Sequence, residues 1–282
     1  MKIQIRLAAV AACFSLLGGI SAVHAFGIGN VLNAAKDVKD VAEAFTMNDA
    51  KEMEIGASVH PFLLSEMGGE LNNRTVTNYV NKIGQKLAVR SQRKNINYHF
   101  TVVDDAMVNA FALPGGYVYV TRGMLATVKD EAELAAVLGH EIGHVEKKHG
   151  VDKMKNLVLA EKGTKLAVSA AGKAGGAIGE QLAGEIANVF AKLALSGYGR
   201  AQELEADRVG VALANSVGYD PDGAVRMFQA LLKMSGGQKG GPFASHPDTE
   251  KRIEQAKQEI TGLSPKGKAT NKPQFASIQK GI

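Results

Sequence analysis

The sequence contains one cysteine, Cys13, and no tryptophan among its 282 residues. A chain with a single thiol has neither an internal disulfide nor a metal site built from several thiolates, so any metal site must use histidine and carboxylate side chains. Proline is scarce, at 7 residues, and aromatic residues make up 6%. This composition excludes collagen-like and wholly disordered classes, and the 45% of hydrophobic residues is typical of a globular core.

The chain also lacks a strong charge of either sign. It has 33 Lys and Arg against 28 Asp and Glu, a net charge of +5. Removal of an N-terminal segment that carries Lys2 and Arg6 would leave 31 against 28, a net charge of +3. A nucleic-acid binder would show clustered basic residues with interleaved aromatics. We therefore expect no nucleic-acid partner.

The long apolar run of the sequence lies at its N-terminus. Residues 7–20 follow the cations Lys2 and Arg6, and the small residue Ala25 ends the segment. This pattern predicts an export signal over residues 1–25, cleaved after Ala25. The run is too short, and is broken too early by glycine, for a confident membrane span.

A lipid anchor is the alternative outcome for this segment. Cys13 follows Val10-Ala11-Ala12, which resembles a bacterial lipobox. However, only six apolar residues precede Cys13, and the apolar run continues beyond it. Cleavage after Ala25 is therefore favoured over a lipid-anchored outer-membrane form.

The mature chain is predicted to form one domain over residues 26–263. Helical periodicity fills residues 26–95, a small antiparallel β-meander covers 96–121, and helices resume over 127–263. The helices are expected at 31–45, 49–67, 75–89, 134–145, 202–216 and 222–234, and the strands at 98–103, 110–113 and 117–121.

Two further segments stand out by composition. Residues 162–190 are rich in Ala and Gly but are interrupted by Lys and Glu side chains, which favours a soluble helical excursion over a membrane hairpin. Residues 264–282 are rich in Lys, Pro, Gly and Ser and are expected to be disordered.

One predicted helix carries the sequence His140-Glu141-Ile142-Gly143-His144. Residues four apart on an α-helix lie one above the other, so both imidazoles can face one metal ion. Glu141 is rotated by about 100° and can reach a water molecule beside the ion. This H-E-x-x-H pattern predicts a zinc site of the hydrolase type.

A catalytic zinc takes three protein ligands. His149 is nine residues beyond His140, so on a continuous helix it would face the opposite side. The better source is Glu203-Leu204-Glu205-Ala206-Asp207, where Glu203 and Asp207 share a helix face. One of these two can bind the metal while the other accepts a hydrogen bond from a ligand histidine. Ala206, Gly210 and Ala214 would let this helix approach the histidine helix closely.

These motifs together resemble the HtpX/LoiP/BepA-like zinc metalloproteases, which are related to the CAAX prenyl protease. The resemblance covers about residues 48–257 and includes Glu54-Ile55-Gly56, residues 79–84, residues 108–116, Ser245-His246-Pro247 and Arg252. It implies a mainly helical α+β, zincin-like domain in which the edge strand of the β-meander faces the active site.

The resemblance also implies roles for individual residues. His140, His144 and Glu203 correspond to the ligands of one Zn²⁺, and Glu141 corresponds to the general base. Asp207 corresponds to a residue often assigned as proton donor, and we expect it to orient a ligand instead.

Further residues are expected around this zinc. His246 and Arg252 would lie at the mouth of the site and stabilise the oxyanion of the intermediate. The strand with Asn109, Ala110, Phe111 and Ala112 would bind an extended substrate through its backbone.

Two functions remain open from the sequence. The first is a zinc endopeptidase in the periplasm of a Gram-negative bacterium that degrades unfolded or misfolded envelope proteins, in association with the outer membrane or its assembly machinery. The second is an envelope chaperone or assembly-binding module with a structural or latent zinc site, for which His246 would be the fourth ligand.

Overall fold

The computed structural model describes residues 47–160, 197–235 and 249–282, all within one compact unit, Ala44–Ile282. The predicted export signal, the helix expected at 31–45, the excursion at 162–190 and His246 lie outside the described residues. Within the described ranges, no helix combines the length and the apolar character needed to cross a membrane.

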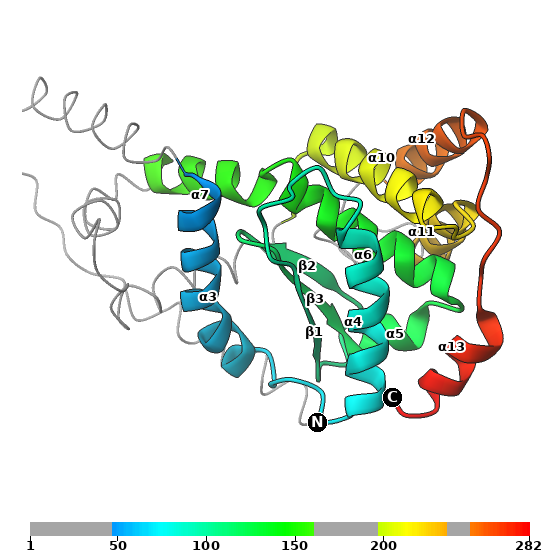
Figure 1. Cartoon of the computed structure of the whole chain (residues 1–282), viewed down its shortest axis with the longest axis horizontal. Coiled ribbons are helices and arrows are strands. Elements are labelled where there is room, and N and C mark those ends of the chain that lie inside the picture. The colour runs from blue at the N-terminus through cyan, green and yellow to red at the C-terminus, as the bar shows by residue number, and fades with distance from the viewer. Residues whose placement is uncertain (1–46, 161–196, 236–248) are drawn as a thin grey trace, which may run out of the picture. The chain divides into compact units, whose positions relative to one another are not determined.

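A three-stranded sheet lies at the centre of the described chain (Figure 1). Strand β1 is His99–Val103, β2 is Ala110–Leu113 and β3 is Tyr117–Thr121. Their order is β1-β3-β2, with β2 antiparallel and β1 parallel to β3. The turn between β2 and β3 places Gly115 and Gly116 at φ angles of 82° and 91°, which favour glycine.

The sheet is therefore mixed, and the prediction of a purely antiparallel meander was wrong for β1. The reason is the burial of β3 on both faces. Val118 and Val120 face one hydrophobic cluster and Tyr119 faces another, so β3 takes the central position. The chain that leaves β1 crosses the place that β3 fills and forms β2 beyond it. When the chain returns as β3, it lies between the two and runs parallel to β1.

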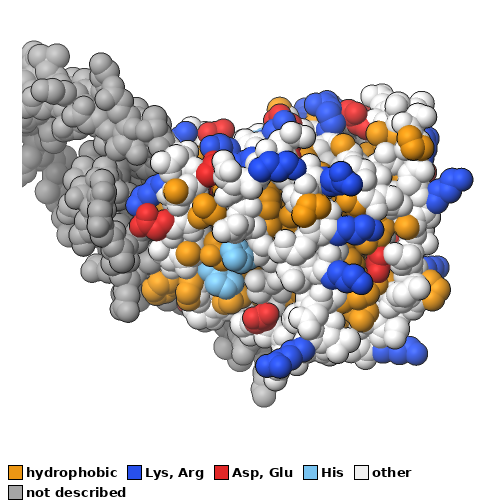
Figure 2. Space-filling model, viewed as in Figure 1, with side chains coloured by type: hydrophobic (Ala, Val, Ile, Leu, Met, Phe, Trp, Pro, Cys, Tyr) orange, Lys and Arg blue, Asp and Glu red, His pale blue; other side chains and the backbone are white. Residues whose placement is uncertain are grey.

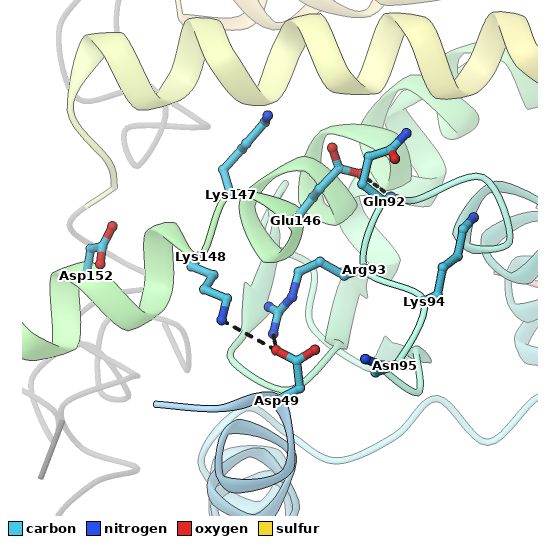
Figure 3. Close-up of a pocket in the computed structure, with 9 residues that line it drawn as sticks. All are labelled: Asp49, Gln92, Arg93, Lys94, Asn95, Glu146, Lys147, Lys148 and Asp152. Atoms are coloured by element: carbon cyan, nitrogen blue, oxygen red, sulfur yellow. Dashed lines mark hydrogen bonds and ion pairs between the residues drawn. The ribbon is translucent and has the colours of Figure 1, made fainter. Parts of the chain in front are cut away.

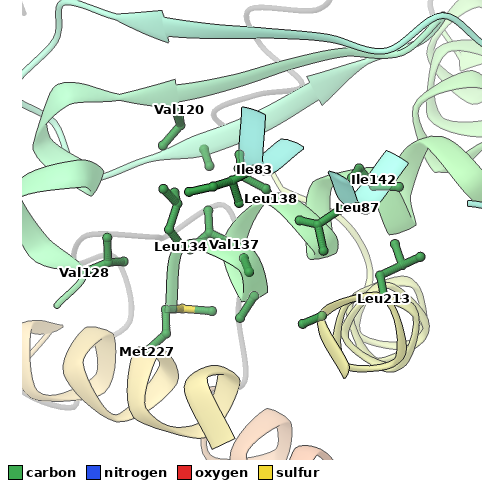
Figure 4. Close-up of a cluster of buried hydrophobic side chains, with 14 of the residues drawn as sticks. Ile83, Leu87, Val120, Val128, Leu134, Val137, Leu138, Ile142, Leu213 and Met227 are labelled. Carbon is green, nitrogen blue, oxygen red and sulfur yellow. The ribbon is translucent and has the colours of Figure 1, made fainter. Parts of the chain in front are cut away.

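Helices cover both faces of the sheet. Helix α3 (Asp49–Glu66) packs on one face and is capped by the Asn48 side chain. Helices α4 (Arg74–Ala88) and α6 (Glu131–Glu146) contribute to the larger cluster on the other face (Figures 1 and 4). The cluster joins β3 to these helices, and it includes Ile83, Leu87, Leu134, Leu138 and Val120.

The remaining helices surround this core. Their bounds are α5 Arg122–Thr127, α7 His149–Ala160, α10 Arg200–Ser216, α11 Asp222–Ser235, α12 Thr249–Thr261 and α13 Lys272–Gln279. Helix α10 packs along α6 and also contacts α12, while α11 contacts both α6 and α12 (Figure 1). The predicted helices at 75–89, 202–216 and 222–234 are confirmed within two residues at each end.

Residues 264–282, which we expected to be disordered, instead form an ordered segment with α13 at its end. Phe275 is fully buried against the core, next to the ring of Tyr79. The side chain of Gln279 donates to the carbonyl oxygens of Leu125 and Val128. The composition of residues 264–282 did not indicate an ordered segment, because one aromatic residue and a few polar contacts are enough to attach it to the core.

Candidate metal centre

Helix α6 carries the H-E-x-x-H residues in the interior of the protein. Its N-cap is Asp130, whose side chain accepts from the backbone N–H of Glu133 at 2.9 Å. His140 and His144 are 3% and 1% exposed, and Glu141 is fully buried. The histidine side chains that are visible at the surface in Figure 2 are therefore not His140 and His144. A helix buried over nearly its whole length holds these side chains in fixed positions.

The other surface histidines have partners of their own. His60 Nδ1 lies 2.7 Å from the Tyr119 hydroxyl, and the His99 ring stacks on that of Tyr117 with centroids 4.6 Å apart. Neither belongs to the described group of residues that could hold a metal. Both side chains contact tyrosines of β3 instead.

Helix α10 approaches α6 closely enough to bring carboxylates to the histidines. A Cβ atom added to Gly143 would lie 2.8 Å from the Ala206 carbonyl oxygen, and one added to Gly210 would lie 2.8 Å from the His140 backbone nitrogen. Only residues without a side chain permit this contact. The expectation that small residues on α10 allow a close approach is confirmed.

Three ligand atoms converge between the two helices. The Nε2 atoms of His140 and His144 are 3.0 Å apart, and the Glu203 carboxylate lies 3.5 Å from the first and 3.7 Å from the second. Tetrahedral zinc with bonds of about 2.0–2.1 Å separates its ligand atoms by about 3.3 Å. The observed distances bracket this value, so the three residues fit a zinc ion.

Asp207 lies on the outer side of His140. Its Oδ1 atom is 2.7 Å from His140 Nδ1, the ring nitrogen that faces away from the ligand cluster. A carboxylate at this position fixes the orientation and tautomer of a metal-binding imidazole. Asp207 is therefore within hydrogen-bond reach of His140 at this nitrogen.

Arg252, which the resemblance implied at the mouth of the site, lies buried among the residues that could hold the metal. It is 1% exposed, and its guanidinium donates to both oxygens of Asp207 at 2.7 Å and lies 3.2 Å from Glu203. Two carboxylates drawn into the interior by α10 need a buried cation, and Arg252 from α12 supplies it. The guanidinium also lies 3.2 Å from His140 Nδ1 and 3.5 Å from His140 Nε2, so it contacts two of the three residues that could hold a metal.

The charges of the site shift the pKa values of its members. Burial and the Arg252 guanidinium each lower the pKa of His140, but Asp207 and Glu203 outweigh them and raise it to about 9. Burial would raise the pKa of Asp207, but Arg252 and His140 lower it below its ordinary value. The carboxylates therefore favour a cation at His140. Because a metal ligand must be deprotonated, a metal ion and a proton would compete for this imidazole.

Sequence reasoning missed His149 and Tyr198. Helix α6 ends at Glu146, and Lys148 has a φ of 58°, so the chain turns before α7 begins at His149. This turn brings His149 Nδ1 to 2.9 Å from His144 Nδ1, and the Tyr198 ring stacks on His144 with centroids 4.0 Å apart. The argument against His149 assumed a continuous helix, and neither residue belongs to a recognisable motif.

The C-terminal end of α6 borders a charged cleft. Asp49, Gln92–Asn95, Glu146–Lys148 and Asp152 line it (Figure 3). Arg93 donates to the Val145 carbonyl oxygen and pairs with Asp49 and Glu52 of α3. A cation at the last turn offsets the negative end of the helix dipole. Arg93 therefore holds the C-terminal end of α6. None of the residues that line the cleft is a predicted site residue.

The predicted substrate strand lies beside α6. Strand β2 is the terminal strand of the sheet and contacts α6, and Asn109, Ala110, Phe111 and Ala112 are 8% exposed or less. Asn109 accepts from the backbone N–H of Thr121, so in an antiparallel ladder the backbone groups of Ala110 and Ala112 face away from β3. Within the described residues no strand pairs with this edge of β2, and Ala110 and Ala112 are both buried there.

Two histidines on one helix, a glutamate from a second helix and a buried glutamate beside the first histidine are the parts of a His₂Glu metallopeptidase site. A comparison with protein families agrees. The Peptidase family M48 model matches residues 74–260, and the chain belongs to this family.

Similar proteins carry related names. The chain is 30% identical over 215 residues to Metalloprotease LoiP of Escherichia coli strain K12, which covers 76% of this chain and 79% of that protein. It is 31% identical over 207 residues to Mitochondrial metalloendopeptidase OMA1 of Arabidopsis thaliana, covering 72% and 40%. It is 26% identical over 261 residues to the Beta-barrel assembly-enhancing protease of Escherichia coli O157:H7, covering 86% and 52%. The chain thus spans about half or less of the length of the last two relatives.

Proposed function

We propose that the protein is a zinc-dependent endopeptidase that hydrolyses peptide bonds of unfolded or misfolded cell-envelope proteins. The observation that carries this proposal is the convergence of His140, His144 and Glu203 within 4.8 Å, with Glu141 buried on the same helix. Membership of family M48 and relatives named as proteases support it.

Glu141 is the proposed general base. When bound by His140, His144 and Glu203, zinc supplies Lewis acidity that polarises the scissile carbonyl and acidifies water. The Glu141 carboxylate takes a proton from the attacking water and passes it to the amine that leaves.

Asp207 and Arg252 are proposed as positioning residues. Asp207 holds the His140 ring through Nδ1, and Arg252 holds Asp207 through two hydrogen bonds of 2.7 Å. His246, which lies outside the described residues, stays a candidate for oxyanion stabilisation or for a fourth ligand that closes the resting site.

Strand β2 is the proposed substrate platform. Backbone pairing with Ala110 and Ala112 would hold an extended chain beside α6 and would accept many side-chain sequences. Folded proteins rarely present a free extended backbone, so this mode favours unfolded substrates. One relative is named a beta-barrel assembly-enhancing protease. On this basis we propose that the protein acts near the outer membrane or its assembly machinery.

The alternative of a chaperone or binding module with a structural zinc is not favoured. The relatives reported above are named as proteases or endopeptidases.

Cleavage of casein and of an unfolded outer-membrane protein by the purified protein tests the proposal. We expect cleavage that a chelator abolishes and added zinc restores. Glu141→Gln should keep the fold and one zinc per chain but lose at least about 10²–10⁴-fold in rate, the usual contribution of a general base. Wild-type protein that holds zinc but cleaves neither substrate would contradict the proposal.

The proposed export is tested separately. Intact mass of periplasmic material should give an N-terminus at Phe26, whereas a lipid on Cys13 would place the enzyme on a membrane.

A further inference from the structure

His149 links a predicted zinc ligand to the surface of α10. Its Nδ1 atom lies 2.9 Å from His144 Nδ1, and its Nε2 atom lies 3.2 Å from Glu205 Oε2. His149 is 3% exposed, whereas the Glu205 side chain is 44% exposed. His144, His149 and Glu205 thus form a chain of two successive contacts, which leads from the ligand cluster to the partly exposed Glu205 on α10.

The positions of the protons in this line follow from the ligand role of His144. An imidazole that binds zinc through Nε2 carries its proton on Nδ1 and donates from there. His149 Nδ1 must then accept, so the proton of neutral His149 is on Nε2 and is donated to Glu205. Each hydrogen bond in this chain of contacts then has one donor and one acceptor.

The two ligand histidines are held by different chemistry. His140 meets the Asp207 carboxylate directly at 2.7 Å, whereas His144 meets a second imidazole. The Tyr198 ring, stacked at an interplanar angle of 20°, limits rotation of His144 about its face but offers its Nδ1 no acceptor through that contact. The contact at Nδ1 joins His144 to His149 and can set the orientation of the His144 ring.

We propose that His149, oriented by Glu205, is a positioning residue for the zinc ligand His144. The inference depends on the proposed function only in that the site holds zinc. The turn at Lys148 is required for this contact, because a continuous helix would place His149 away from His144.

Zinc affinity of the full chain, measured by competition with a chelator, tests the proposal. His149→Leu removes the acceptor and keeps most of the volume, and we expect it to lower zinc affinity by about 10- to 100-fold, as losses of outer partners of zinc ligands do. His149→Asn should recover much of the affinity, because Asn Oδ1 is as many bonds from the backbone as His Nδ1 and accepts. Asp152→Asn, an exposed change on the same helix, is the control and should leave the affinity unchanged.

Glu205→Ala is the second variant, chosen because the Glu205 side chain is partly exposed and its loss leaves the core intact. We expect a smaller fall in zinc affinity than in His149→Leu, with a changed visible spectrum of the cobalt-substituted protein. Zinc affinity equal to that of Asp152→Asn in both His149→Leu and Glu205→Ala would overturn the proposal. An equal loss in His149→Asn and His149→Leu would also overturn it, because packing alone would then explain His149.

Failure of the proposed function gives a different result. Wild-type protein that binds zinc but cleaves no substrate would refute the peptidase, while the affinity series would still decide the role of His149. Wild-type protein that cleaves substrate, with unaltered affinity in both variants, would refute only the positioning role.

Discussion

Substitution of Gly210 by alanine tests how the spacing of α6 and α10 sets the metal site. The added Cβ would lie 2.8 Å from the backbone nitrogen of His140 and 3.1 Å from the carbonyl carbon of Gly139. Carbon atoms in ordinary contact are about 3.5–4.0 Å from their neighbours, so the helices must separate by about 0.6 Å or more. Metal–ligand distances tolerate only about 0.2 Å. The substitution should thus move Glu203 out of reach of an ion held by the two histidines.

The size of the effect follows from the cost of overpacking, about 1–3 kcal/mol for an extra methyl group in a packed interior. The metal-free protein can relieve part of this cost by separating the helices, whereas the zinc-bound protein cannot. If the whole cost falls on the bound state, zinc affinity drops by about 5- to 150-fold. Any part that falls on the metal-free state lowers its free energy of unfolding, partly offset by about 1 kcal/mol from the better helix propensity of alanine.

Chelator competition and thermal unfolding with and without zinc measure the two parts. Gly262→Ala is a matched control, because the nearest atom to its added Cβ is 3.5 Å away and no positive φ is involved. Gly210→Ala protein with wild-type zinc affinity and an unchanged rise of the unfolding temperature on zinc addition would refute the argument from helix spacing.

Three further predictions concern single side chains. Asp207→Ala should lower zinc affinity by about 10- to 100-fold by removing the carboxylate at His140 Nδ1, and activity should return with excess zinc; a variant that excess zinc cannot restore would show that Asp207 acts on the reacting groups. The pKa of Asp49 is lowered from 3.8, chiefly by its hydrogen bond with Arg93, so its stabilising effect is present above about pH 4 and is lost as the pH falls below it. Urea unfolding should therefore show a stability difference between wild type and Asp49→Asn that shrinks below pH 4, and a difference constant from pH 7 to 2 would contradict this reasoning. Phe275→Ala should cost about 3–5 kcal/mol in the free energy of unfolding, as expected for a buried ring, whereas no change would return the C-terminal segment to the disordered interpretation.

The sequence alone determined what depends on local spacing and local hydrogen bonds. The four-residue interval between His140 and His144 places both on one helix face, whatever that helix packs against. Asn48 and Asp130 accept from backbone N–H groups three residues ahead, so the starts of α3 and α6 could be predicted from residue type. The family resemblance rests on the same short motifs.

Only the tertiary structure decided the contacts between distant segments. The parallel pairing of β1 with β3 depends on which strand is buried on both faces, and no local pattern encodes it. The contact of Arg252 with Asp207 depends on the packing of α12 against α10. The contact of His149 with His144 depends on a left-handed conformation at Lys148, a residue that gives no local sign of one. Local interactions fix which atoms a segment can offer, and the burial of charge and apolar surface across the whole chain fixes which of them meet.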